Sequence, residues 1–412
     1  MITPSFSLTA TERVLPKLAL DFTTGSLDSR VTFTRATSAS NPATYTDVSG
    51  NLVLATNNQP RFDYKNGVCQ GLLIEESRTN INGNGAWLGA ATGSPGTAPT
   101  NWFFSRTGGS IDSITTGSLS ENILTFSATT NRQVISLNTT TVANTTYSGS
   151  VYVHSNTGLP FNQIFNAQFF PAGTTVTLFA NGVSVTGTYV PIAGDRLTAV
   201  AAVSTTTGNI TWQAGLGILS NVTGTVTLSK VQIEVGAFAT SYIPTTTAAL
   251  TRNADVATMT GANFSDWFNA TEGTLLSVGS RFGTSNVFPR LAQIDDGTDS
   301  SVINVFINNS SNQAGGSVAA AGVTSASYSG FNIGGTSAVG TVAIAYKQDS
   351  FGFAADSVGG TPDTSGNLPT VNQMAFGLRR TGPAYLNGHI AKIMYWPQRL
   401  TQSELNSFTK GN

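Results

Sequence analysis

The feature that most constrains the fold is a period-two alternation of apolar and polar residues, which places apolar side chains on one face of an extended strand. Residues from Thr174 to Val190 alternate in this way on both sides of the dipeptide Asn181-Gly182. Both residues of that dipeptide tolerate positive φ, which a tight two-residue turn requires. The pattern therefore predicts a β-hairpin with its turn at Asn181-Gly182.

A second alternating run, Thr225 to Val235, changes parity in its middle. Val226 and Leu228 fall on one face of the strand, whereas Val231 and the alternating apolar residues after it fall on the other. One extra residue near Ser229-Lys230, a β-bulge, would return all of them to a single buried face. The sequence therefore predicts a long strand with a bulge at this point.

Other short strands with similar patterning are separated by turns rich in Gly, Asn and Ser. We expect them at Ser148–His154, Asn209–Ile218, Thr274–Val278, Val302–Ile307, Thr341–Tyr346, Phe351–Phe353 and Ile390–Trp396. Short strands at this spacing predict an all-β chain of tandem β-sandwiches, of the jelly-roll or concanavalin-like type.

Helical signals are scarce. Thr401 and Glu404 have the spacing of a capping box, in which each residue binds the backbone amide of the other, and Leu400 and Leu405 fit the accompanying hydrophobic staple. They predict a short C-terminal helix packed on a sandwich edge. A second short helix is expected from Ser265 through Phe268.

Composition excludes several classes of partner. Charged residues are only 10% of the 412 residues, and 20 Lys and Arg residues balance 21 Asp and Glu residues, for a net charge of −1. Nucleic acids and anionic membranes bind proteins that carry a basic surplus, so we expect neither as a partner. The absence of an apolar run of about 18 residues predicts no membrane insertion. Residues 1–20 lack the pattern of a signal peptide.

The few residues suited to redox or metal chemistry are widely scattered. Cys69 is the only cysteine, so an intrachain disulfide is excluded, and we expect it to be a small buried apolar residue. His154 and His389 lie too far apart in sequence for a two-histidine metal motif, and we expect ordinary hydrogen bonds for both. The run from Asp295 to Asp299 favours a turn, although its oxygens could hold calcium. The sequence thus predicts no metal ion and no cofactor.

Differences in charge density and patterning divide the chain into three parts. Residues 1–83 hold most of the dense charge. Residues 84–246 form a first β-module and residues 247–412 a second. The Thr-rich run from Thr245 to Thr247 is the predicted linker between the two modules.

Several stretches resemble one family. Leu20 to Ala36 resembles the opening motif of phage virion proteins of the tail fibre or structural type, and the motifs at Pro60 to Asp63, Gly71 to Asn80 and Gln232 to Pro244 are similar to the continuation of that pattern. The end of the chain, from Gly388 to Leu405, is similar to the last strand and helix of concanavalin/laminin-G-like sandwiches. Residues 84–231 carry no motif of this family.

The resemblance implies a phage virion structural protein, a tail fibre, head fibre or adhesin that is assembled in the host cytoplasm and resides in the virion. Residues 1–83 would be an extended segment for oligomerisation and for attachment to other virion proteins of the capsid, portal or tail. The first sandwich would be of carbohydrate-binding-module type and the second concanavalin/laminin-G-like, and both would serve to bind host surface glycan. A homotrimer would raise the strength of weak sugar binding by avidity.

Three other functions stay open: a capsid or tail decoration protein that stabilises the particle without a sugar ligand, a polysaccharide depolymerase, and a secreted bacterial lectin. A depolymerase needs two carboxylates about 5 to 10 Å apart. The doublets Glu75-Glu76 and Asp295-Asp296 do not supply such a pair, because neighbouring residues on a strand point to opposite faces. We therefore expect no enzymatic activity, and the missing signal-peptide pattern argues against the lectin.

The charged residues of the N-terminal segment are candidate attachment or interface residues. They are Asp21, Asp28, Arg30, Arg35, Arg61, Asp63, Glu75, Glu76 and Arg78. The predominance of Arg over Lys suits bidentate pairs at an interface. The alternative is that these pairs stabilise the fold of their own chain, and the sequence leaves both interpretations open.

Among the tryptophans, Trp102 is the candidate sugar-binding residue, because it follows a Gly-, Pro- and Thr-rich loop and an aromatic face packs well on a pyranose ring. A place in the core is the alternative for Trp102. Trp267 and Trp396 lie beside other aromatic residues, and we expect both to be buried.

Overall fold

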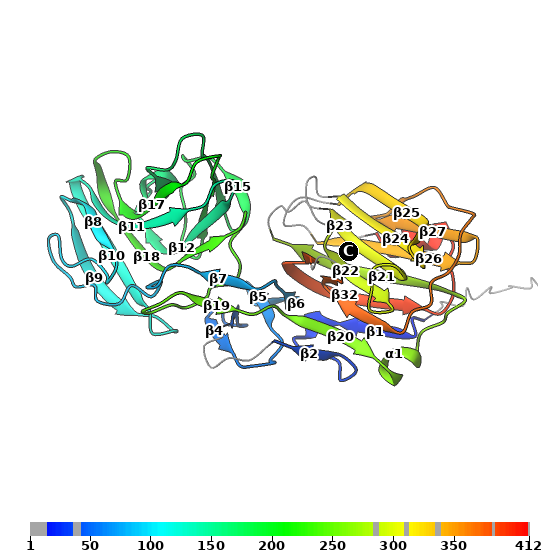
Figure 1. The fold of residues 1–412 in the computed structure, drawn as a ribbon. Helices are drawn as coiled ribbons and strands as arrows, with labels where there is room; N and C mark the ends of the chain where they lie inside the picture. Colours follow the sequence, from blue (N-terminus) through cyan, green and yellow to red (C-terminus); the bar gives the residue numbers. More distant parts are fainter. Residues whose placement is uncertain are drawn as a thin grey trace, which may run out of the picture.

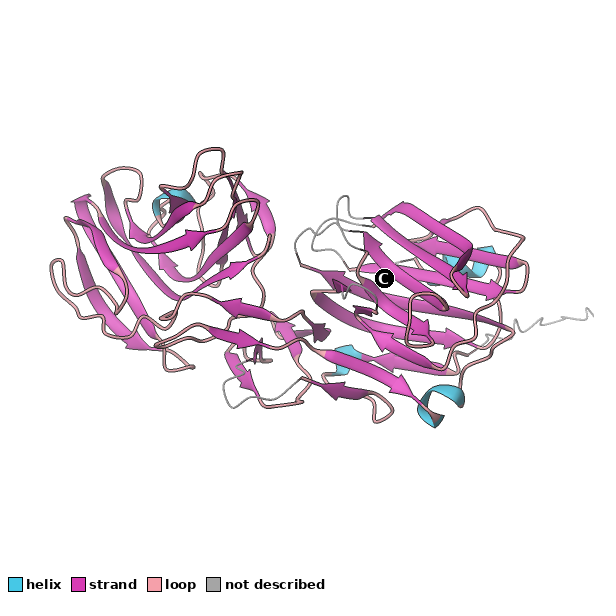
Figure 2. Ribbon diagram, viewed as in Figure 1, coloured by secondary structure: helices cyan, strands magenta, loops and turns pink. Residues whose placement is uncertain are grey.

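A computed structural model describes residues 15–35, 43–282, 288–308, 313–333, 339–380 and 384–410 of the chain. These residues form two β-sandwiches that lie next to each other and are joined by a junction of shorter strands (Figure 1). Helices are few and short, as the colouring in Figure 2 makes plain. The predicted all-β fold of tandem sandwiches is confirmed.

The first sandwich packs a seven-stranded sheet on a four-stranded sheet. The seven-stranded sheet has the order β15 (Val183–Val185), β14 (Thr175–Ala180), β16 (Arg196–Ala202), β12 (Thr146–Asn156), β18 (Val222–Val235), β10 (Asn122–Asn131) and β9 (Ser110–Thr116). The four-stranded sheet has the order β13 (Phe165–Gln168), β17 (Gly208–Leu216), β11 (Gln133–Thr141) and β8 (Phe103–Thr107). We call this unit the inserted sandwich, because its strands come from one continuous stretch of chain.

The second sandwich packs an eight-stranded sheet on a seven-stranded sheet. The first of these contains β28 (Val358–Gly359), β27 (Ser350–Ala355), β26 (Gly340–Lys347), β21 (Glu272–Arg281), β32 (Gly388–Trp396), β6 (Val68–Ile74), β5 (Phe62–Lys65) and β1 (Leu18–Asp21). The other has the order β2 (Thr32–Thr34), β20 (Val256–Thr260), β29 (Gln373–Phe376), β22 (Arg290–Asp295), β23 (Val302–Asn308), β24 (Gln313–Ala320) and β25 (Val323–Asn332). We call this unit the split sandwich, because its strands come from both ends of the chain.

The described parts of residues 1–83 do not form the separate extended segment expected from the sequence. β1 and β6 pair with β32, and β2 pairs with β20, so these strands belong to the split sandwich. Their apolar residues Leu18, Leu20 and Leu72 lie in its core, and such short strands bury their side chains only by joining a larger sheet. Gly71 permits the close pairing, since a Cβ there would lie 2.2 Å from the carbonyl oxygen of Ile390. Residues 1–14 and 36–42 lie outside the described residues.

The connection between the sandwiches is a pair of strands, and the linker predicted at Thr245 to Thr247 precedes the second of them. β7 (Arg78–Asn80) leads into the inserted sandwich, β19 (Leu250–Arg252) leads out of it, and the two pair antiparallel. Thr245 is buried, and its hydroxyl donates to the carbonyl of Asn82 at 2.6 Å. A hairpin of β3 (Ala43–Thr46) and β4 (Leu52–Ala55) lies beside this connection.

The strand predictions are confirmed, including both local irregularities. Asn181 and Gly182 have φ of 50° and 79° and join β14 to β15. Lys230 has φ of 57°, and the register of β12 against β18 shifts beside it, as a bulge requires. The bulge returns Val226, Leu228 and Val231 to one buried face.

The helices agree with the sequence in one case and differ in the other. α2 (Gln402–Phe408) begins after Thr401, and the reciprocal bonds of Thr401 and Glu404 complete the capping box. α1 (Ala262–Ser265) ends where the second helix was expected to begin. Turn hydrogen bonds continue after Ser265, the amide of Phe268 donating to the carbonyl of Phe264, and Trp267 lies in the core of the split sandwich. Two short 3-10 helices lie at Phe22–Thr24 and Phe161–Gln163, and β30 (Leu378–Arg379) pairs with β31 (Ala384–Tyr385).

Each sandwich has its own hydrophobic core. Trp87, Trp102 and Trp212 lie in the core of the inserted sandwich. Trp267 lies in the core of the split sandwich, and Trp396 lies in a smaller cluster beneath α2, so both predictions of burial are confirmed. Among the described residues, no helix has the length and apolar character that crossing a bilayer would demand.

Candidate functional site

A buried ion cluster holds the junction together. Arg61 pairs with both Glu75 and Asp255, Arg252 pairs with Glu75 at 2.8 Å, and Arg35 pairs with Asp255 at 3.1 Å. All five side chains are at most 1% exposed. Since a charge buried without a partner is very costly, this geometry keeps every member of the cluster paired.

The cluster reaches into the inserted sandwich through a segment that follows β18. Ser241 donates to Glu75 through its backbone amide and through its hydroxyl, both at 2.7 Å. Burial opposes ionisation of Glu75, but Arg252 and Arg61 outweigh burial and lower the pKa of its carboxyl group to about 2. Glu75 is therefore a carboxylate that links the two sandwiches.

The nine N-terminal charged candidates all take part in ion pairs or charged hydrogen bonds, and an interface role stays a prediction for those that are exposed. Each one pairs within its own chain: Asp21 with Lys392, Asp28 with Arg30, Arg35 with Asp255, Arg61 with Glu75 and Asp255, Asp63 with His389, and Glu76 with Arg78. For Arg35, Arg61 and Glu75 the predicted interface role is wrong, because burial inside the chain closes them to a partner protein.

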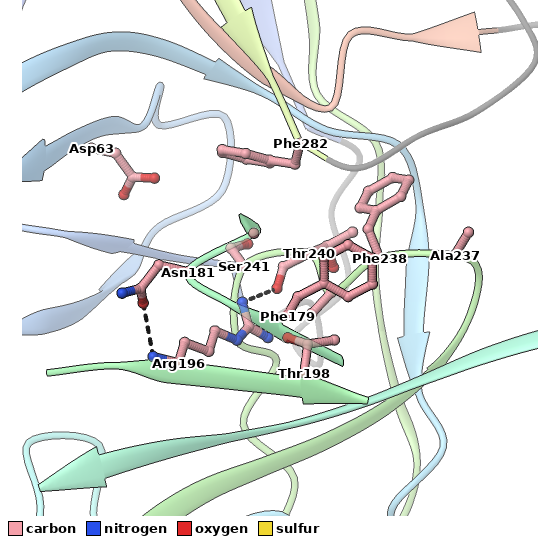
Figure 3. Close-up of a pocket in the computed structure, with 12 residues that line it drawn as sticks. Asp63, Phe179, Asn181, Arg196, Thr198, Ala237, Phe238, Thr240, Ser241 and Phe282 are labelled. Atoms are coloured by element: carbon pink, nitrogen blue, oxygen red, sulfur yellow. Dashed lines mark hydrogen bonds between the residues drawn. The ribbon is translucent and has the colours of Figure 1, made fainter. Parts of the chain in front are cut away.

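A groove lies between the sandwiches, directly beside the ion cluster. Its first half, with a cavity volume of about 220 Å³, is lined by three aromatic rings, Phe179, Phe238 and Phe282 (Figure 3). Phe179 comes from β14 of the inserted sandwich, and Phe282 directly follows β21 of the split sandwich. The two sandwiches therefore supply opposite walls of this half, which we call the aromatic half.

Polar side chains complete the aromatic half. Arg196 donates from its guanidinium to the carbonyl of Thr240 at 2.5 Å, and its backbone amide donates to Asn181 at 2.9 Å (Figure 3). Its guanidinium also lies 5.2 Å from the ring centre of Tyr152. These bonds fix Arg196 and Asn181 in place, so the polar groups beside the rings are preorganised.

The second half continues from the first and has a volume of about 620 Å³. Asp63, Asn181, Gly182 and Phe282 line both halves, so the two cavities form one groove. The second half adds charged side chains of the split sandwich, Lys65, Arg281 and His389, and we call it the charged half.

The two carboxylates that line the groove already accept hydrogen bonds from the protein. Asp63 accepts from the amide of Thr46 at 2.7 Å and lies 3.1 Å from the Nε2 atom of His389. Asp195 accepts from Asn181, from the hydroxyl of Tyr189 and from the amide of Ile192. Such carboxylates are suited to holding the shape of the groove.

The other residues singled out from the sequence have structural surroundings. Trp102, predicted as a sugar-binding residue, is 6% exposed and packs edge-on against Trp87 at 5.8 Å, so its ring offers no open face and that prediction is wrong. Its loop curls inward because burying so large an apolar surface is favourable. Cys69 is buried as expected, and His154 is hydrogen-bonded to Ser229 at 2.8 Å.

The Asp295 to Asp299 stretch is a turn, as expected. Gly297 has φ of 96°, and its amide donates to Asp295 at 2.7 Å. Asp295 also pairs with Arg380 at 3.2 Å. In the part of the chain that the structure describes, no group of three or more His, Cys, Asp or Glu side chains gathers as a metal site would require.

Sequence reasoning missed the aromatic residues of the groove, although one of them carries a signal. In the alternating run of β14, Val176 and Leu178 face the core of the inserted sandwich, and Phe179 falls between polar residues on the opposite face. An aromatic ring at this position points away from the core of its own sandwich. Phe238 and Phe282 lie outside alternating runs and have no comparable signal.

No family model matches the sequence, and no curated protein matches it. Among solved structures, the chain is similar to the Ruminococcus gnavus IT-sialidase CBM40 bound to α2,3-sialyllactose, with 16% identity, 34% of this chain and 84% of that chain covered, and a TM-score of 0.30. It is also similar to the NanB sialidase of Streptococcus pneumoniae, with 13% identity, 36% and 26% of the two chains covered, and a TM-score of 0.30.

A third similar structure is the heptameric SAP-like pentraxin of Limulus polyphemus, with 9% identity, 34% of this chain and 70% of that chain covered, and a TM-score of 0.27.

Proposed function

We propose that this chain is a phage virion structural protein, a fibre or adhesin, that binds host surface glycan in the groove between its two sandwiches and does not cleave it. The observation that carries the proposal is the aromatic half, where Phe179, Phe238 and Phe282 line one cavity edged by hydrogen-bonding side chains. Aromatic faces and preorganised polar groups are the combination that binds a sugar ring.

The sequence motifs that resemble phage virion proteins support the proposal by their position. Arg61, Glu75 and Ser241 come from three of those motifs, and all three take part in the buried contacts behind the groove. The motifs therefore build the scaffold that sets the sandwiches at a fixed distance. Attachment to capsid, portal or tail proteins and a homotrimer are part of this proposal, and avidity would then strengthen weak sugar binding.

Binding without cleavage is favoured over a depolymerase by the state of Asp63 and Asp195. Both carboxylates are held by protein donors, whereas a glycosidase needs one carboxylic acid and one carboxylate free to act on the glycosidic bond. A decoration protein without a sugar ligand is the main alternative, and it gives the open aromatic half no role.

The test measures binding of the purified chain to polysaccharide extracted from candidate host cells. We expect Phe179→Ala and Phe282→Ala each to weaken binding by about tenfold, since a stacked ring contributes about 0.5–1.5 kcal/mol beyond its buried area. Phe103→Ala is the matched control, because Phe103 is 44% exposed on β8, away from the groove. Unchanged binding in both groove variants would show that the glycan binds elsewhere. Release of reducing ends would show that the chain cleaves the polysaccharide.

The virion role has its own test. Mass spectrometry of purified particles should detect the chain, and antibody labelling should place it on a fibre. Labelling spread over the head lattice, with no glycan binding, would support the decoration protein instead.

A further inference from the structure

One wall of the aromatic half is the outer face of the seven-stranded sheet. Thr198 of β16 pairs with Phe179 of β14 on one side and with Ser150 of β12 on the other. Cross-strand partners project to the same face of a sheet, so Thr198 has an aromatic ring and a hydroxyl as its neighbours there. This is the outer face, because Val176 and Leu178 of β14 pack on the core and Phe179 has the opposite parity.

Much of the remaining lining is apolar. Ala237, Phe238 and Ala239 come from the segment that follows β18, and Phe282 comes from the split sandwich (Figure 3). With Phe179, three rings and two methyl groups line a cavity of about 220 Å³. Pockets that enclose a drug-sized ligand measure about 300–1,000 Å³, so this half has room for one sugar unit.

Most polar side chains of the aromatic half are already hydrogen-bonded within the chain. The Ser241 hydroxyl takes part in three hydrogen bonds inside the ion cluster, and the Thr240 hydroxyl donates to a buried glutamate. Asn181 donates to Asp195 at 2.7 Å and accepts from the backbone amide of Arg196 at 2.9 Å. These groups hold the shape of the cavity and have little capacity left for a ligand.

Arg196 is engaged in the same way. Two of its side-chain nitrogens donate to the hydroxyl of Ser150, at 3.2 and 2.8 Å, and the third donates to the carbonyl of Thr240. Most of its hydrogen-bonding capacity is therefore used inside the inserted sandwich.

Thr198 is the exception among these polar side chains. Across the described ranges, its hydroxyl forms no hydrogen bond with another group of the chain. A hydroxyl both donates and accepts, so Thr198 is able to meet one ligand hydroxyl. A ligand hydroxyl turned toward the rings or the alanines would lose its water and gain no partner. The cavity therefore favours a sugar in which an apolar group replaces a hydroxyl.

We propose that the aromatic half binds one 6-deoxyhexose unit of the glycan, with its methyl group among the rings and alanines and one of its hydroxyls on Thr198. This inference rests on the proposed function and adds the ligand class. A 6-deoxyhexose has a methyl group where a hexose has a hydroxymethyl group, so it brings one polar group fewer into the cavity. An N-acetyl sugar also carries a methyl group, but its amide adds a donor and an acceptor that need partners.

The experiment measures binding of the full chain to polymer conjugates that each display one sugar, because display of many copies makes weak binding measurable. The matched pairs are L-fucose with L-galactose and L-rhamnose with L-mannose, which differ only at carbon 6. N-acetyl-D-glucosamine with D-glucose is the amide pair. We expect at least one 6-deoxy sugar to bind at least about fivefold more tightly than its partner and than the N-acetyl sugar, since a single carbon in an apolar pocket changes binding by about tenfold or more.

Two substitutions locate the sugar. Thr198→Val keeps the shape of the side chain and removes the hydroxyl, so it should weaken binding of the 6-deoxy sugar by about threefold to tenfold. Thr177→Val is the matched control, because Thr177 is an exposed residue of β14 that does not line the cavity. Both variants should keep the thermal unfolding temperature of the parent chain, which the same samples report.

Phe282→Ala tests the preference itself. It removes the ring that the split sandwich contributes to the cavity, so the additional hydroxyl of L-galactose or L-mannose would stay in water. The ratio between the two members of a pair should therefore fall toward one. Phe103→Ala, outside the groove, should leave that ratio unchanged.

The outcomes separate this inference from the proposed function. Equal binding within both 6-deoxy pairs, or tighter binding of the N-acetyl sugar, would overturn the 6-deoxy ligand and leave glycan binding in the groove in place. No binding of any conjugate would also overturn it, and the measurement on host polysaccharide then decides the proposed function separately. A 6-deoxy preference that neither Thr198→Val nor Phe282→Ala changes would overturn the placement in the aromatic half.

Discussion

The inserted sandwich is made from one continuous stretch of chain, whereas the split sandwich is assembled from two stretches that flank it. In the inserted sandwich, the hairpins β9–β10 and β14–β15 join strands that are close in sequence. In the split sandwich, Leu20 of β1 pairs with Ile393 of β32, at the far end of the chain. A division of this chain into consecutive segments therefore separates strands that belong to the same sandwich.

The two units also use charge differently. The core of the inserted sandwich is formed mainly by apolar side chains, and Lys230 and Glu121 form a buried salt bridge in this unit. The split sandwich meets the junction through the buried ion cluster of Arg35, Arg61, Glu75, Arg252 and Asp255. The position of the groove walls depends on that cluster, since Ser241 is bound to it and lines the aromatic half.

The largest effect should come from deleting residues 1–83. The deletion removes β1, β2, β5 and β6, so the split sandwich should lose its cooperative thermal transition while the inserted sandwich retains its own. Differential scanning calorimetry of the truncated chain checks this. Two intact transitions would show that the N-terminal strands are dispensable and would break the comparison.

The reciprocal excision is the control for that deletion. Joining Asn82 to Ala248 removes the inserted sandwich and leaves four residues between Asn80 and Leu250, which pair in β7 and β19. A loop of four residues closes a hairpin readily. We expect the remaining chain to fold with the transition of the split sandwich, and aggregation or a missing transition would contradict an insertion.

The next effect concerns the inserted sandwich alone. Trp102→Ala should destabilise it by about 3–5 kcal/mol, as truncation of a buried tryptophan does. The transition of the split sandwich should not move, because Trp102 belongs to the core of the other unit. Denaturant unfolding followed by fluorescence measures the loss of stability. Scanning calorimetry shows whether the transition of the split sandwich moves. Unchanged stability with lost glycan binding would instead restore Trp102 as a surface residue.

A comparable loss is expected at the junction. Glu75→Ala leaves Arg61 and Arg252 without one of their partners and should cost about 3–5 kcal/mol. Asp28→Ala is the matched control, because Asp28 and Arg30 form a half-exposed pair whose loss should cost at most about 1 kcal/mol. Urea unfolding compares the two variants. Equal losses would mean that the cluster contributes no more than a surface pair.

The same carboxylate predicts a dependence on pH. The pKa of Glu75 is about 2 in the folded chain and 4.5 as an ordinary glutamate, so the unfolded chain binds its proton first as the pH falls. The stabilisation, on the order of 3 kcal/mol, is therefore present above about pH 4.5 and is lost progressively toward pH 2. The difference in unfolding free energy between the parent chain and Glu75→Gln should shrink across this window. A constant difference would contradict the charged state of Glu75.

Local features could be predicted from the sequence because neighbouring residues determine them. The hairpin at Asn181-Gly182, the bulge at Lys230 and the capping box at Thr401 each depend on backbone angles or hydrogen bonds within a few residues. The alternation that predicts the all-β class is local in the same sense. The groove was not predicted, because Phe179, Phe238 and Phe282 are brought together only by the packing of the two sandwiches.

The amino-acid sequence by itself thus determined the strands, their turns and the kind of sheet they form. Only the tertiary structure decided that the strands β1, β2, β5 and β6 complete the split sandwich, that Trp102 faces inward, and that Phe179 and Phe282 line one groove. Each of these joins residues far apart in the chain. Their free energy comes from burial and charge pairing that exist only once both stretches are packed together, so no local pattern records it.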